Sequence, residues 1–364
     1  MDKRLLWIDW MKTVAIFGII GIHVSSQLLN PDFLFSLKWY QGVFAASAFR
    51  FGVILFIMAS GYLTLRRQQT IYEIPKRFKR IFVPFAFWLI LYCIIKVVFQ
   101  NVLGPTWNLG DLLGFIYRGF LDPTVISIQF WFVYMILGLY IFSPILSRWI
   151  QNAPIKEIEY ALWIWIIVSI LQFFNVNSLI LDYSRYFTGA IGYFIFGYYL
   201  TVKDDDLYRN RTFGMMLFLV GTAITFFGTI SFSMVSFDQS LFFIKLGDIT
   251  PGACLQGIGL FIVIFNTNFD NFNSRINNIV MKLSESSYGI YLANILVIKV
   301  LEKIHIINLD SFTLLSIIIS TVLVIIVSAA VIDIMNMIPV LRIFSSKKAG
   351  KTISIKNLKI KKRV

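Results

Sequence analysis

The chain has 364 residues, of which 58% are hydrophobic and only 14% are charged. Soluble domains carry about 25% charged residues, so this composition excludes an ordinary soluble domain and indicates an integral membrane protein. The net charge of +14 does not indicate nucleic-acid binding, because the basic residues are distributed as membrane topology requires. Cys93 and Cys254 lie in apolar runs without a disulfide framework or metal-ligand spacing, so we expect no metal.

Ten apolar runs approach the length of about 20 residues that a helix needs to cross a bilayer. The runs are continuous and do not alternate, so we predict an all-α, polytopic membrane fold. The first run follows basic residues as a signal peptide does, but Lys12 and His23 interrupt it, and we predict a retained helix. The stretch 100–128 is expected to be irregular. The predicted spans are 11–29, 42–65, 81–99, 129–149, 158–174, 186–202, 212–232, 250–268, 287–304 and 312–338.

Positive charge orients these spans, because cytoplasmic loops retain Lys and Arg. With the amino terminus inside, 24 of the 33 Lys and Arg residues fall in cytoplasmic segments and 6 in external ones. We therefore predict that both termini are cytoplasmic. Residues 1–341 form the predicted transmembrane domain, and 342–364 form a basic tail that is attracted to anionic membrane lipid. The Ile-, Phe-, Lys- and Asn-rich composition is typical of a low-GC bacterium, and we expect a multi-pass protein of the bacterial plasma membrane.

The first predicted helix combines a carboxylate, an ammonium and an imidazole. Lys12 and His23 are 11 residues apart, so they share one face and differ in depth by about 16 Å. Asp9 can pair with Lys12 on the same side. Ionisable groups at membrane depth usually face a polar cavity. We therefore predict a cavity open to the cytoplasm, with Lys12 at its rim and His23 near mid-membrane as an acid–base group, against the alternative of a structural buried histidine.

A basic loop follows the second predicted span. It carries six Lys and Arg residues between Arg66 and Arg80, and Arg77 and Arg80 begin the third span on one face. Arginine forks suit phosphate, so we predict that Arg66, Arg67, Arg77 and Arg80 bind a phosphate-bearing ligand together with Lys12. Retention of basic residues on the cytoplasmic side is the alternative explanation.

Five motifs in this order resemble the acyltransferase family 3 membrane proteins. The similarity is greatest to the surface-polysaccharide O-acetyltransferase branch that includes the enterobacterial common antigen O-acetyltransferase. The resemblance extends from Trp7 to Asn294. The motifs are "WIDWMKTVAIFGIIGIH", "FIMASGYLTLRR", "KRFKRIFVP", "FWFVYMILGLYIFSPIL" and "LSESSYGIYLAN".

The resemblance assigns roles to single residues. The family pattern of a basic residue, ten residues and a histidine falls on Lys12 and His23, where the family usually has arginine at the first position. The Arg-x-x-Arg pattern falls on Arg77 and Arg80. Asn294 departs from the family, which commonly has histidine there, so His23 is the only histidine at a family position. Residues expected to bind substrate are Ser60, Gln129, Trp131, Tyr288, Tyr291 and Asn294.

The resemblance implies an O-acyltransferase that uses cytoplasmic acyl-CoA, most often acetyl-CoA, as donor. His23 and Asp9 are the predicted catalytic residues. The acceptor would be a hydroxyl of a cell-envelope polysaccharide or of its lipid-linked precursor. A transporter or flippase for a lipid-linked glycan, and a scaffold of a polysaccharide synthesis complex, are the alternatives. We expect contacts with membrane lipid, acyl-CoA and a glycan acceptor but not with nucleic acid, and a homo-oligomer is left open.

Overall fold

The computed structural model describes residues 4–173, 189–236, 250–307 and 313–346, and in these ranges every regular element is a helix. The all-α prediction is confirmed. The α-helices are α1 (Leu6–Ser25), α2 (Leu37–Ala48), α3 (Phe51–Leu65), α4 (Ile74–Gln100), α5 (Leu109–Leu121), α6 (Trp131–Asn152), α7 (Ile155–Phe173), α9 (Ile191–Val202), α10 (Arg211–Ser236), α12 (Pro251–Phe265), α13 (Ser274–Lys303) and α14 (Leu314–Met337).

Each of the ten predicted spans overlaps a helix. Among the described residues, six segments are long and apolar enough to cross a membrane, and the apolar helices α9 and α12 are shorter. The protein is therefore a multi-pass membrane protein, while the total of ten spans and the side of the termini stay predictions. The six segments are Leu6–Leu28, Leu37–Leu65, Ile71–Gln100, Ile128–Asn152, Arg211–Met234 and Leu314–Met337.

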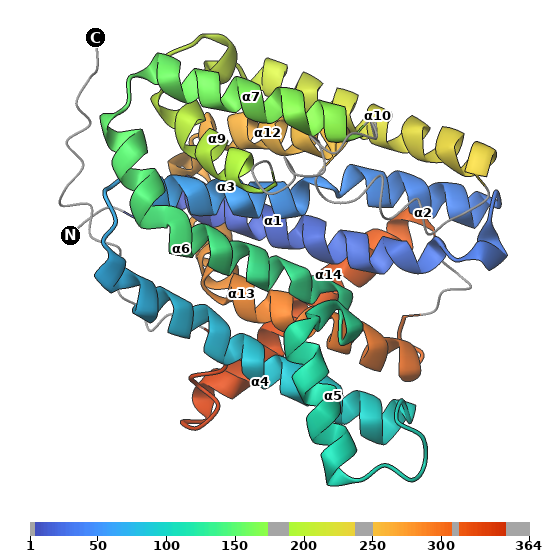
Figure 1. Ribbon diagram of the computed structural model, residues 1–364. Helices are drawn as coiled ribbons and strands as arrows, with labels where there is room; N and C mark the ends of the chain where they lie inside the picture. The colour runs from blue at the N-terminus through green and yellow to red at the C-terminus, as the bar shows by residue number, and fades with distance from the viewer. Residues whose placement is uncertain (1–3, 174–188, 237–249, 308–312, 347–364) are drawn as a thin grey trace.

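Helix α1 lies at the centre of the bundle (Figure 1), where it contacts α3, α13 and α14. It runs antiparallel to α3, because Gly18 faces Phe51 while Trp7 packs on Tyr62. It runs parallel to α13, because Trp10 near its start bonds to Asn277 and His23 near its end bonds to Asn294. Parallel directions fit the predicted first and ninth spans, which would cross the membrane in the same direction.

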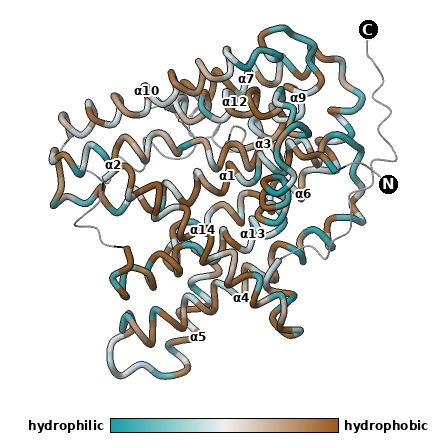
Figure 2. Tube along the Cα trace, turned by 180° about the vertical axis from the view of Figure 1, so that it is seen from behind, coloured by the Kyte–Doolittle hydropathy of each residue, from teal (hydrophilic) through white to brown (hydrophobic). Residues whose placement is uncertain are grey.

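The outer surface of the bundle is apolar. Side chains on α10 and α14 that lie more than half exposed include Leu219, Phe227, Ile319 and Ile326. Figure 2 shows hydrophobic residues along the helices, with hydrophilic residues gathered at the end of the bundle where the chain begins. An apolar surface of this extent is covered by lipid in a membrane protein, because water would leave it unfavourably exposed.

The segment 100–128, which we expected to be irregular, contains α5, so that prediction was wrong. Asn108 and Asp111 form a capping box that starts the helix. With only 13 residues α5 is too short to span a bilayer, and Figure 1 shows it projecting from the bundle beside α4. Its outward stripe is apolar and consists of Leu109, Leu113, Tyr117 and Leu121.

Glycine permits the close crossing of α3 and α9. A Cβ atom on Gly61 would overlap the carbonyl oxygen of Phe194. We expect Gly61→Ala to lower the free energy of unfolding by about 1–3 kcal/mol, because the two backbones would have to separate. The measurement is thermal unfolding of the purified chain in detergent.

The control is Gly138→Ala in α6, where an added Cβ would meet nothing within 4 Å. Alanine is the better helix former, so this variant should unfold at the same temperature as the wild type or higher. Equal melting temperatures for both variants would contradict the proposed close packing.

Candidate active site

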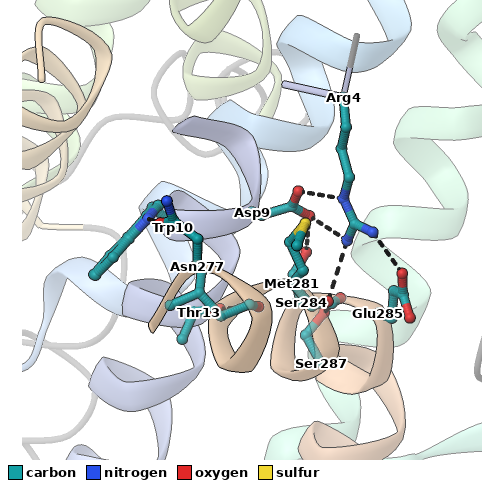
Figure 3. Close-up of polar contacts among 10 residues, drawn as sticks. Arg4, Asp9, Trp10, Thr13, Asn277, Met281, Ser284, Glu285 and Ser287 are labelled. Atoms are coloured by element: carbon teal, nitrogen blue, oxygen red, sulfur yellow. Dashed lines mark hydrogen bonds and ion pairs between the residues drawn. The ribbon is translucent and has the colours of Figure 1, made fainter. Parts of the chain in front are cut away.

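The amino-terminal ends of α1 and α13 are joined by an ion-pair network (Figure 3). The Arg4 guanidinium donates from Nε to Asp9 Oδ2 at 2.6 Å and from Nη2 to Asp9 Oδ1 at 3.0 Å. Its Nη1 lies 2.6 Å from Glu285 Oε1, and its Nη2 donates to the Met281 carbonyl. Ser284 Oγ donates to Asp9 Oδ1 at 2.6 Å. The Asp9 carboxylate therefore has three donors from two partners, and it ties the start of α1 to α13.

This network corrects the predicted pairing of Asp9. The ion pair of Asp9 is with Arg4 rather than with Lys12. Asp9 and His23 lie 14 residues apart on one continuous helix, which separates them by about 21 Å. Asp9 is therefore too far from His23 to contact its imidazole, and its bonds join α1 to α13, while a catalytic role for Asp9 stays a prediction.

We expect Asp9→Asn to lower the free energy of unfolding by about 1–3 kcal/mol, because the charge-assisted bonds from Arg4 are weakened. The activity per folded molecule should stay within a few-fold of wild type. Melting temperature and acyl-transfer rate of the same preparations separate the two effects. Asp204→Asn, at an exposed position after α9, is the matched control. Loss of activity at unchanged stability would support a catalytic role for Asp9.

His23 lies half-buried in the last turn of α1, and its imidazole contacts α13. Its Nδ1 is 2.7 Å from Asn294 Oδ1. The Asn294 amide is oriented because its Nδ2 donates to the Tyr291 carbonyl, which leaves Oδ1 as the atom facing the histidine. An oxygen can only accept, so Nδ1 carries the proton in the neutral ring. Nε2 is then the basic nitrogen that can accept a proton from a substrate.

A second set of hydrogen bonds fixes the segment of α13 that carries Asn294. Tyr291 donates its hydroxyl to the Gln129 carbonyl, in the short 3-10 turn just before α6. The Tyr92 hydroxyl of α4 donates to the Leu292 carbonyl at 3.1 Å and accepts from the Leu296 amide at 2.8 Å. Gln129 and Tyr291, which we predicted to bind substrate, are thus brought into the frame that positions His23. Tyr92 was not identified from the sequence, where a tyrosine in an apolar span carries no distinct signal.

The remaining predicted substrate residues lie on three different helices. Ser60 is buried in α3 beside the crossing with α9. Tyr288 donates its hydroxyl to the Ile81 carbonyl of α4 at 3.0 Å, so it too joins two helices. Trp131, the first residue of α6, is half-buried and packs edge-on against Phe132. Binding of a sugar by these side chains stays a prediction.

The structure divides the predicted phosphate-binding arginines. Arg67 Nη2 lies 3.0 Å and Arg77 Nη2 3.2 Å from the same Glu73 carboxylate oxygen. Arg66 lies over the Tyr62 ring, with its guanidinium carbon 5.9 Å from the ring centroid. Internal partners therefore engage these three arginines.

Arg80 has different surroundings. It lines a pocket of about 310 Å³ at the end of the bundle where α4 begins. Lys12 lies within electrostatic reach of Arg80, as it does of Arg4 and Asp9. Arg80 and Lys12 thus belong to one basic neighbourhood, and their binding of phosphate stays a prediction.

The face of α1 between Lys12 and His23 is packed. Ala15, Ile16 and Ile19 are at most 3% exposed, and none of them lines the pocket beside Arg80. The predicted open cavity from Lys12 to His23 is therefore wrong for this conformation. The depth of His23 in the membrane stays a prediction.

The fold and the site together define a polytopic membrane protein in which Asn294 orients His23, and in which basic residues gather at the other end of α1. The sequence model of the acyltransferase domain of acyltransferase family 3 matches residues 5–333. The chain belongs to this family and is an acyltransferase. No curated protein and no solved structure matches the chain. The similarity to the enterobacterial common antigen branch stays a prediction.

Proposed function

We propose that this acyltransferase moves an acyl group, most simply acetyl, from acyl-CoA to a hydroxyl of a cell-envelope polysaccharide or of its lipid-linked precursor. It would act in the bacterial plasma membrane. The observation that carries the proposal is the hydrogen bond between His23 Nδ1 and Asn294 Oδ1. This bond leaves Nε2 of His23 as the nitrogen that can accept a proton, and the other end of the same helix carries cations. Acyl transfer from CoA needs a proton acceptor for the hydroxyl and cations for the CoA phosphates.

The proposed reaction needs one general base and no further reactant. His23 Nε2 accepts the proton of the acceptor hydroxyl as its oxygen attacks the thioester carbonyl. The new C–O bond forms, the C–S bond breaks, and the proton passes to the departing thiolate. The products are an O-acyl ester and free CoA, so atoms and charges balance.

The two substrates would approach from opposite ends. The phosphates of CoA suit the basic neighbourhood of Lys12 and Arg80, about 16 Å along α1 from His23. The acceptor would arrive near the far end of α1, where Trp131 offers an aromatic face for a sugar ring. Because Ala15, Ile16 and Ile19 are buried, the helices around α1 would have to separate slightly for the thioester to reach His23.

The test is an assay of the purified full chain with acetyl-CoA and an envelope fraction. Thiol release and incorporation of radiolabelled acetyl into alkali-labile esters are expected together. A flippase would instead move lipid-linked glycan across proteoliposomes without releasing thiol, and a scaffold would do neither. Absence of both thiol release and acetyl incorporation would overturn the proposal.

A further inference from the structure

The pocket beside Arg80 is built from two segments that are far apart in the sequence. One wall is the first two turns of α4, with Lys76, Lys79 and Arg80, and the other is the turn after α14, with Arg342. The second wall lies beyond residue 333, where the family match ends. The family resemblance therefore accounts for Arg80 on the first wall but not for Arg342 on the second.

The turn after α14 is held against the bundle. Phe344 stacks on Phe87 of α4, with ring centroids 4.6 Å apart and planes inclined by 14°. This contact keeps Arg342 and Ile343 beside α4. The predicted boundary between a membrane domain and a tail at residue 342 therefore falls inside a packed turn, whose residues up to Ser346 belong structurally to the domain.

The four cations of the pocket have no counter-ion in the described part of the chain. No carboxylate lines the pocket, and no hydrogen bond or ion pair of these side chains is formed among the described residues. Arg77, in the same turn of α4, contrasts with them because it is paired with Glu73. Retention of positive charge on one side of a membrane does not require basic residues to converge, and convergence costs repulsion that a bound anion would relieve.

We propose that Lys76, Lys79, Arg80 and Arg342 bind the phosphate of an amphipathic ligand. Two arginine guanidinium groups and two lysine ammonium groups can donate several hydrogen bonds to one phosphate and balance its negative charge. Val83 and Ile343 supply an apolar side to the same pocket. The pocket lies where α4 changes from basic to apolar, which is where a phosphate attached to a membrane-associated molecule would sit.

Two ligands carry this chemistry. One is the 3′-phosphate of the CoA donor, and this source rests on the proposed function. The other is the headgroup phosphate of an anionic glycerophospholipid. Either phosphate would be bound by the same four cations, so the two ligands are distinguished by the probe that is used in the binding experiment.

The experiment compares full-length wild type with Arg342→Gln. For the first source, CoA and dephospho-CoA, which lacks the 3′-phosphate, are titrated by calorimetry. Wild type should bind CoA more tightly, and R342Q should lose roughly ten-fold in CoA affinity and lose the preference. For the second source, native mass spectrometry follows retention of phosphatidylglycerol against phosphatidylcholine, and R342Q should lose a retained phosphatidylglycerol.

Two further variants complete the design. Lys76→Gln/Lys79→Gln should reproduce the effect of R342Q from the other wall. Lys282→Gln, an exposed cation of α13 that does not line the pocket, should behave as wild type. Either a CoA effect or a phosphatidylglycerol effect that depends on Arg342 supports the pocket and names its source.

Failure of the pocket and failure of the proposed function have different signatures. Equal binding of CoA and equal retention of phosphatidylglycerol by wild type and R342Q would overturn the pocket, even while thiol release by wild type upheld the acyl transfer. Retention of phosphatidylglycerol that depends on Arg342, in a chain that releases no thiol, would uphold the pocket and overturn the acyl transfer.

Discussion

Replacement of His23 by glutamine should lower the rate of acyl transfer by at least about 100-fold, because a positioned general base contributes factors of that size. Glutamine is similar in size and can still donate to Asn294, but its amide cannot take up a proton near neutral pH. The rate is measured as thiol release from acetyl-CoA and as acetyl incorporation into the acceptor. Thermal unfolding of the same preparation shows that the loss is chemical.

The chain supplies its own matched control for this prediction. His305 is the only other histidine, and it lies exposed just after α13. His305→Gln should keep the wild-type rate. Full turnover by H23Q would rule out His23 as the general base, while leaving the acyl transfer itself in place.

Asn294 should act as a positioning residue for the same ring. Asn294→Leu removes the oxygen that holds the proton on Nδ1, so the ring can rotate or change tautomer. We expect kcat to fall roughly 10- to 100-fold with little change in KM for acetyl-CoA, a size of effect seen when residues that orient an imidazole are removed. Steady-state kinetics at several acetyl-CoA concentrations separate the two parameters.

A conservative variant and a control distinguish orientation from stability. Asn294→Asp keeps an acceptor oxygen toward Nδ1 and should recover most of the lost kcat. Asn277→Leu lies on the same helix but loses a bond to Trp10 at the other end, so it should lower the melting temperature and leave kcat unchanged. If N294D were as slow as N294L, the orienting role of Asn294 would be refuted.

Local sequence patterns were sufficient to predict an all-α membrane fold and the placement of Lys12 and His23 on one helix. Continuous apolar runs place each predicted span on a helix, because hydrogen bonding within a segment is the only way to satisfy the backbone in lipid. The spacing of Lys12 and His23 is confirmed on one unbroken helix, since the period of an α-helix depends only on neighbouring residues. The short helix α5 was missed because it has only 13 residues and the apolar runs that predict membrane spans are longer.

Partners across the bundle could not be obtained in this way. Periodicity identifies which residues share a face, but not which helix lies opposite that face. Asp9 was therefore assigned to Lys12, three residues away, when its ion pair is with Arg4 and its further hydrogen bond comes from Ser284. Arg77 likewise has internal partners that periodicity did not identify, because Glu73 and Gln69 contact it.

Composition, continuous apolar runs and five ordered motifs were enough to predict a helical membrane acyltransferase whose first helix carries Lys12 and His23 on one face. The packing of the helices adds that Asn294 contacts that histidine, and that Arg342 lies beside the start of α4 in one basic pocket. The physical reason is that both arrangements depend on side chains more than 250 positions apart, whose approach is set by helix packing and leaves no trace in local composition or spacing.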